Sequence, residues 1–168
     1  GTNSGYVFRK FVRNYAGQGR SDGDLAWPVI RLADVYLMYA EATNEVSGPT
    51  VEAIDLVNKI RARGALPPLA AGKTADRDVF FDAIEQERII ELIAEGHRGF
   101  DLRRWRAIER VWGGPGSPGL WRIDTWGANQ TRYFQNFSDR DYEQNYIFRI
   151  PPAERDRNPN LTQNAPWR

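Results

Sequence analysis

The chain has 168 residues, of which 23 are lysine or arginine and 22 are aspartate or glutamate. The net charge of +1 gives no strong field for attracting nucleic acid or an anionic membrane, and the absence of cysteine excludes disulfides and thiolate metal sites. No apolar run reaches the roughly 18 residues of a membrane-spanning helix, and no signal peptide precedes the rest.

Residues 1–28 are rich in glycine, asparagine, arginine and aromatic residues, so we expect irregular structure there. Apolar residues at helical spacing predict a helix over 31–46, which is apolar nearly all round and is therefore expected to be sandwiched between neighbours. A second helix is predicted over 51–63, with Thr50 as its N-cap and Gly64 as its stop. The connection is short, which favours an antiparallel hairpin of the size of one tetratricopeptide-type repeat unit.

A third helix is predicted over 76–95, capped near Thr74 or Asp76 and broken by Gly96, and a fourth over 100–111. These two helices suggest a second hairpin stacked on the first. From residue 112 onward the chain is rich in turn-forming residues and aromatics. A long loop region is expected there, with a brief extended piece before Pro151 and a turn of helix after it.

The predicted fold class is therefore mainly α. Stacked helical hairpins of tetratricopeptide-like type occupy 29–111, between an irregular lead-in over 1–28 and a long, irregular, loop-rich covering segment over 112–168. The length fits a single domain, 1–168.

Two carboxylates lie on a helical face with core residues, because at about 100° per residue Glu87, Glu91 and Arg98 fall on one stripe with Phe80 and Ile84. An unpaired carboxylate in a core costs several kcal/mol, so both acids should meet guanidinium groups. Glu87 and Glu91 are expected to accept from Arg61, Arg63 or Arg98, and Asp101 from Arg103 or Arg104. The predicted structural ion network comprises Glu87, Glu91, Arg98, Asp101 and Arg61.

Two chemical alternatives remain open for the same acids. Glu95 and His97 invite a metal site, but they are two residues apart, where a di-iron helix uses three, and the chain has a single histidine. Glu87 and Glu91 could act as the acid and base of a glycoside hydrolase, which requires an open cleft. We predict no catalytic residue, no metal and no cofactor. The arginines around Trp105 are interleaved with acids, so nucleic acid is not an expected partner either.

Trp112, Trp121 and Trp126 accompany a glycine-rich stretch. An indole presented from a loop can stack on the apolar face of a sugar ring, and neighbouring polar side chains can bond its hydroxyls. The alternative is that these rings clamp the loop onto the helices. We predict these three residues as ligand-binding candidates.

Four blocks of the sequence resemble the C-terminal part of the SusD/RagB family. They are RLADVYLMYAEA at 31–42, VNKIRAR at 57–63, the run from Glu87 to Trp105, and FRIP at 148–151 with NPNLTQN at 158–164.

Members of that family are non-enzymatic lipoproteins of the outer-membrane surface. They bind glycans or other nutrients over a SusC-like TonB-dependent transporter. The resemblance implies a fragment of a longer protein, with its lipid anchor on an N-terminal segment absent from this chain. It also implies binding of a nutrient, with an oligosaccharide expected, and delivery to the transporter. The alternative is a helical-repeat module that binds protein or peptide.

Overall fold

The computed structural model describes residues 10–11, 17, 26–112, 121–124, 131–134 and 143–167. The chain forms two compact units, which are taken separately: Phe8–Arg98, and Gly1–Val7 with Gly99–Arg168. The described part is mainly helical, which confirms the predicted fold class.

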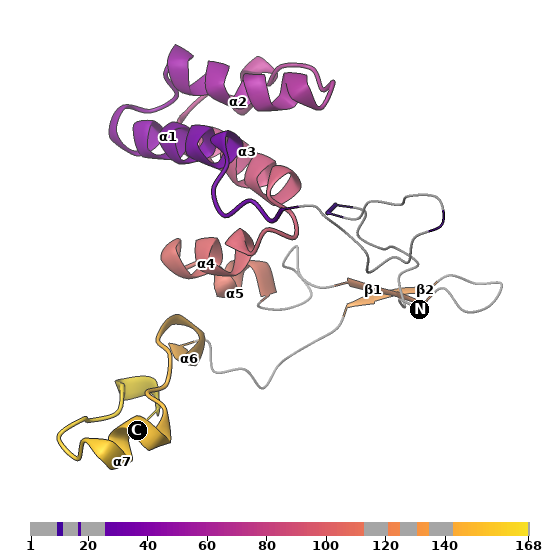
Figure 1. The fold of residues 1–168 in the computed structure, drawn as a ribbon. Coiled ribbons are helices and arrows are strands. Elements are labelled where there is room, and N and C mark those ends of the chain that lie inside the picture. The colour runs from indigo at the N-terminus through magenta and orange to yellow at the C-terminus, as the bar shows by residue number, and fades with distance from the viewer. Residues whose placement is uncertain are drawn as a thin grey trace. The chain divides into compact units, whose positions relative to one another are not determined.

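Three helices pack side by side in the unit Phe8–Arg98: α1 (Leu32–Ser47), α2 (Val51–Arg63) and α3 (Arg77–Glu91) (Figure 1). A short 3₁₀ turn, η1 (Ala71–Lys73), precedes α3. The core contains three alanines, one from each helix, and small side chains allow neighbouring helices to approach closely. Its buried residues are Leu37, Ala40, Ala53, Val57, Ile60, Phe80, Ala83, Ile84 and Leu92.

Side-chain caps begin two of these helices, as the sequence predicts. The Thr50 hydroxyl accepts from the Ala53 N–H at 3.3 Å, and the Asp76 carboxylate accepts from the Val79 N–H at 2.9 Å. Each cap satisfies a backbone donor that the first helical turn leaves without a partner. The hairpin of α1 and α2 is therefore specified locally as well as by its core.

The helix α1 is not sandwiched within the described part of the chain, contrary to the sequence expectation. The helices α2 and α3 cover the side that carries Leu37 and Ala40, whereas Leu32 and Val46 on another side are 61% and 87% exposed. Apolar residues all around a helix therefore do not guarantee that another element packs against each of its sides.

Helix α2 ends in a Schellman motif whose left-handed residue is Ala65, although the sequence places the stop at Gly64. Ala65 has φ +56°, while Gly64 has φ −86°. The Leu66 N–H donates to the Arg61 carbonyl and the Ala65 N–H to the Ala62 carbonyl, each at 3.0 Å. The conformation that glycine tolerates best is thus occupied by a residue with a Cβ atom.

The third helix is shorter than predicted. It ends at Glu91 rather than Glu95, because Leu92 is its C-cap and Ala94 (φ +62°) and Gly96 (φ +86°) turn the chain out of the helix. Glu95 therefore belongs to a turn.

The predicted fourth helix is two helices, α4 (His97–Arg104) and α5 (Ile108–Trp112). Arg106 separates them with φ +52°, and the Ala107 N–H donates to the Leu102 carbonyl at 2.9 Å. This is a second Schellman ending.

Around α5, the unit with Gly99–Arg168 holds a small core of Leu102, Ala107, Ile108 and Val111. The Ile108 N–H donates to the Tyr146 hydroxyl at 3.1 Å, and the Gln163 side chain bonds both the N–H and the carbonyl of Ile150, at 2.9 and 3.1 Å. The remaining elements are the antiparallel pair β1 (Trp121–Asp124) and β2 (Thr131–Phe134), then α6 (Glu143–Tyr146), α7 (Pro152–Arg157) and η2 (Ala165–Trp167).

None of the helices in the described segments combines the length and the apolar character needed to cross a bilayer.

Replacing Ala65 by glycine should stabilise the protein. The change removes the strain of a Cβ atom in the left-handed region, about 1–2 kcal/mol, and this exceeds the entropy gained by the unfolded chain, about 0.5–1 kcal/mol. We expect Ala65→Gly to raise the free energy of unfolding in urea by about 0.5–1 kcal/mol. Ala62→Gly, the same change inside α2, should lower it by about the same amount. A loss of stability in Ala65→Gly would contradict this account.

Candidate functional site

Arg31, immediately before α1, contacts two carboxylates that follow about sixty residues later. Its Nε lies 2.8 Å from Glu95 Oε2, and its Nη2 lies 2.7 Å from Glu95 Oε1. The same Nη2 donates to the backbone carbonyl of Glu91 at 2.7 Å, and Nη1 donates to the Glu91 carboxylate. Nearly all of its N–H donors are therefore used, as planar guanidinium geometry allows.

Glu91 and Glu95 each receive a second cation. The Nη2 of Arg63 lies 2.6 Å from both carboxylate oxygens of Glu91, and Lys10 Nζ contacts Glu95 and donates to the Glu91 carbonyl at 2.7 Å. The Glu95 side chain is 1% exposed and that of Glu91 9%. These contacts compensate the desolvation that burial of two carboxylates requires.

Further ion pairs extend along α3. Arg61 Nη1 lies 2.9 Å from Glu87 Oε2, and Arg88 Nη1 lies 3.1 Å from Asp34 Oδ1, with both members of the latter pair buried. The adjacent residues Glu87 and Arg88 therefore tie the same turn of α3 to α2 and to α1, respectively.

The structure places Arg98 differently from the sequence prediction. Its Nη1 lies 2.8 Å from Glu85 Oε1, and not at Glu87 or Glu91, because the turn after Glu91 takes Arg98 off the helical stripe that it was predicted to share.

Asp101 lies in the second unit and bonds Arg104, its neighbour three residues on, at 2.9 Å to Nη2 and 3.0 Å to Nε. This pair is local to α4.

Sequence reasoning missed Arg31, Lys10 and Glu95 as members of the network. The position of Arg31 was an available signal. An arginine directly before a helix faces the positive end of the helix dipole, which is unfavourable unless acidic groups pair with it. The sequence also contained a signal for Asp34. The buried stripe of α1 follows a 3-4-3 spacing and includes polar residues: Asp34, Leu37, Glu41 and Asn44.

The contacts between Arg31, Lys10 and Glu95 favour the charged forms of Arg31 and Glu95. Burial raises the pKa of the Glu95 carboxyl, but hydrogen bonds from Arg31 and Lys10 outweigh burial and hold that pKa below its ordinary value. The hydrogen bond to Glu95 in turn raises the pKa of Arg31, more than burial lowers it. Both groups are ionised at neutral pH.

The geometry at Glu87 and Glu91 is that of ion pairs within a helical interface. Glu87 and Glu91 are engaged by arginines and face the packed helices, whereas hydrolysis of a glycosidic bond needs two carboxyl groups facing an open cleft. No group of three or more potential metal ligands gathers within the segments that the structure describes.

The three tryptophan candidates fall largely outside the described residues. Trp112 ends α5 and Trp121 begins β1, where it is paired with Phe134, but their side chains are not among the described groups. Trp126 lies wholly outside the described segments. Their role as ligand contacts stays a prediction.

The sequence pattern that describes the SusD family matches residues 1–167. SusD-like protein P2 of Formosa agariphila is 31% identical over 156 residues, which is 90% of this chain and 28% of that protein. SusD-like protein P25 of the same organism is 47% identical over 78 residues, or 46% of this chain and 15% of that protein.

A crystal structure of a SusD-like protein from Bacteroides fragilis is similar with a TM-score of 0.70 and 28% identity, over 90% of this chain and 27% of that chain. This chain therefore spans less than a third of the length of these relatives.

Removal of Glu91 should destabilise the fold. Glu91→Ala leaves Arg31 and Arg63 short of an acceptor, which we expect to lower the free energy of unfolding by about 3 kcal/mol. Glu45→Ala is the matched control, because Glu45 forms an exposed pair with Arg77 and should cost less than about 0.5 kcal/mol. Urea titrations measure both. Unchanged melting with lost ligand binding in Glu91→Ala would refute the structural role.

The lowered pKa of Glu95 predicts a stability loss in acid. Its contribution is complete above the ordinary carboxyl value of 4.5 and declines as the pH falls from there through the lower folded-state pKa. The free energy of unfolding should therefore decrease between pH 6 and pH 3.5 less steeply in Glu95→Gln than in the unmodified protein. Parallel profiles for the two proteins would contradict this assignment.

Proposed function

Since the chain belongs to the SusD family, we propose that it is a non-catalytic nutrient-binding component and that its ligand is an oligosaccharide. The match over residues 1–167 is the observation that carries the proposal. The named relatives in both comparisons are SusD-like proteins, which supports the same role.

The proposed place of action is the cell surface, at the outer membrane. There the protein delivers its ligand to a SusC-like TonB-dependent transporter, and its membrane attachment is a lipid anchor on a segment preceding this sequence. Family membership is the support for these features.

Binding without hydrolysis agrees with the state of the acids. The most conspicuous carboxylates of the sequence, Glu87 and Glu91, each form ion pairs with arginines that hold the helices together. A carboxylate held by an arginine in this way is not free to face a substrate oxygen across an open cleft.

The sugar contacts in this proposal come from Trp112, Trp121 and Trp126. An indole ring buries a large apolar area at a small cost in side-chain entropy, and an oligosaccharide offers matching apolar ring faces. Stacking of this kind holds a ligand without chemically activating it.

A second candidate is a helical module that binds protein or peptide. It is favoured by the exposed apolar side of α1, where Leu32, Val35, Met38 and Val46 are between 43% and 87% exposed. Exposed apolar patches on helices are common sites of protein association.

A glycan-binding assay tests the leading proposal. The chain, immobilised and probed with neutral and acidic oligosaccharides, should bind at least one class and release it unaltered. Trp121→Ala should weaken binding by up to about tenfold, whereas Trp27→Ala, at a tryptophan that is 55% exposed in the other unit, should leave it unchanged. Binding to no glycan, together with capture of a defined peptide, would favour the second candidate.

A further inference from the structure

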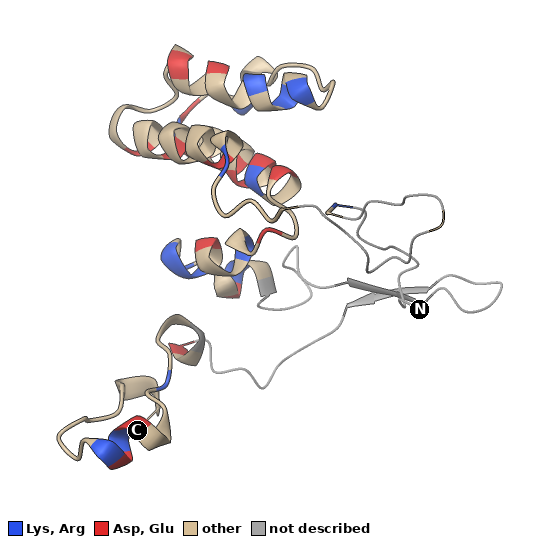
Figure 2. Cartoon of the chain, viewed as in Figure 1, with Lys and Arg blue, Asp and Glu red and all other residues tan. Residues whose placement is uncertain are grey.

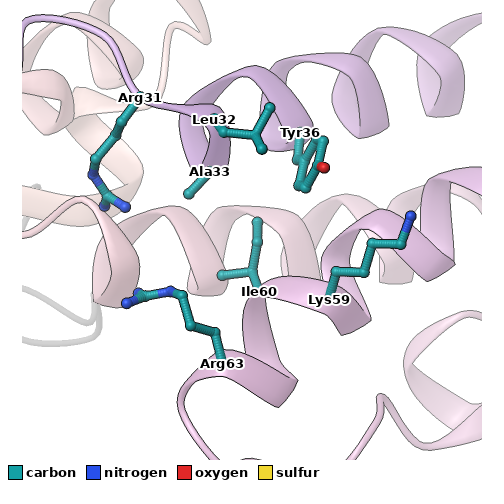
Figure 3. A pocket seen from close by; sticks show the side chains of 7 residues that line it. All are labelled: Arg31, Leu32, Ala33, Tyr36, Lys59, Ile60 and Arg63. Atoms are coloured by element: carbon teal, nitrogen blue, oxygen red, sulfur yellow. The ribbon is translucent and has the colours of Figure 1, made fainter.

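A pocket of about 300 Å³ opens between the first turns of α1 and the last turns of α2. We call it the α1–α2 pocket. In Figure 3, Leu32 and Tyr36 project from α1 toward Ile60 and Lys59 on α2. Its lining combines apolar groups, one phenol ring and three cations: Arg31, Leu32, Ala33, Tyr36, Lys59, Ile60 and Arg63.

The three cations differ in how far their charge is already compensated. Arg31 is held by Glu91 and Glu95, as described above. Arg63 uses Nη2 for Glu91, so its Nε–H and Nη1–H groups have no partner among the described residues. Lys59 lies over the Tyr36 ring, with Nζ 5.9 Å from the ring centroid, and meets no carboxylate of the described segments within 4 Å. With respect to the described residues, the pocket therefore has uncompensated positive charge beside an aromatic face.

The sequence of α2 concentrates that charge. Acidic residues occupy its first half and basic residues its last two turns, as Figure 2 shows: Glu52 and Asp55, then Lys59, Arg61 and Arg63. Cations are favoured at a helix C-terminus because the dipole is negative there. The negative end of the α2 dipole therefore stabilises Lys59 and Arg63 at one rim of the pocket, in addition to any pairing with acids.

We propose that the α1–α2 pocket binds one carboxylate-bearing sugar unit, a uronate, of the oligosaccharide; this inference rests on the proposed function. Lys59 and the free N–H groups of Arg63 receive the carboxylate, and the sugar ring lies against Tyr36, Leu32 and Ile60. The volume lies at the lower end of the range for ligand pockets, which suits a single sugar ring. Charge-assisted hydrogen bonds to a carboxylate discriminate against neutral sugars.

Titration calorimetry of the chain with oligogalacturonate and with alginate oligosaccharides tests the inference. Each probe is compared with its carboxyl-reduced, neutral counterpart. A sulfated oligosaccharide that contains no carboxylate serves as a separate arm. We expect at least one uronate probe to bind at least about tenfold more tightly than its neutral counterpart, with the preference falling as salt is raised. Lys59→Gln should abolish the preference without changing the melting temperature.

Lys73→Gln is the matched control, since it removes one exposed positive charge from η1, away from the pocket. It should keep the preference intact, and Lys59→Arg should retain most of it. Equal binding of uronate and neutral probes, or an unchanged preference in Lys59→Gln, would overturn the inference while leaving glycan binding in place. Tighter binding of the sulfated probe than of either uronate would overturn the choice of carboxylate. Binding of no glycan at all would remove the proposed function as well.

Discussion

The fold of the unit Phe8–Arg98 depends on the desolvation of carboxylates on and just after α3. Glu87, Glu91 and Glu95 enter a packed helical interface, where an unpaired charge would cost several kcal/mol. Each is offset by a guanidinium that comes from α2 or from the residue before α1. Charge-assisted hydrogen bonds are directional, and the pair of Arg31 and Glu95 is bidentate. These contacts therefore constrain how far α3 can slide or rotate against its neighbours, more tightly than the apolar core alone would.

The helices themselves were predictable, because apolar spacing and the caps at Thr50 and Asp76 act within a few residues. The partners of the buried acids were only partly predictable. That Glu87 and Glu91 require arginines follows from burial, but which arginine each meets depends on how the helices are rotated. The left-handed residue Ala94 carries no sequence signal, and it moved Glu95 into the network and Arg98 to Glu85.

The cations around α1 and α2 form a graded series. Arg31 donates nearly all of its N–H groups to carboxylates and a carbonyl. Arg63 donates from one nitrogen to Glu91, and Lys59 lies over an aromatic ring. The committed members hold the scaffold, and the uncommitted ones can interact with a ligand without loosening it. Lys59 forms no ion pair with the described part of the chain, so a change at that position leaves the contacts that hold the helices in place.

The bond from Arg31 to Glu95 joins groups that are 64 positions apart in the chain. The α1–α2 hairpin needs only local chain closure, whereas this contact requires α3 and its following turn to have docked already. We therefore expect the ion network to form late in folding and to break early in unfolding. Interactions of that kind govern how long the native state persists more than how fast it is reached. The ion network therefore contributes more to the lifetime of the native state between unfolding events than to the rate of folding.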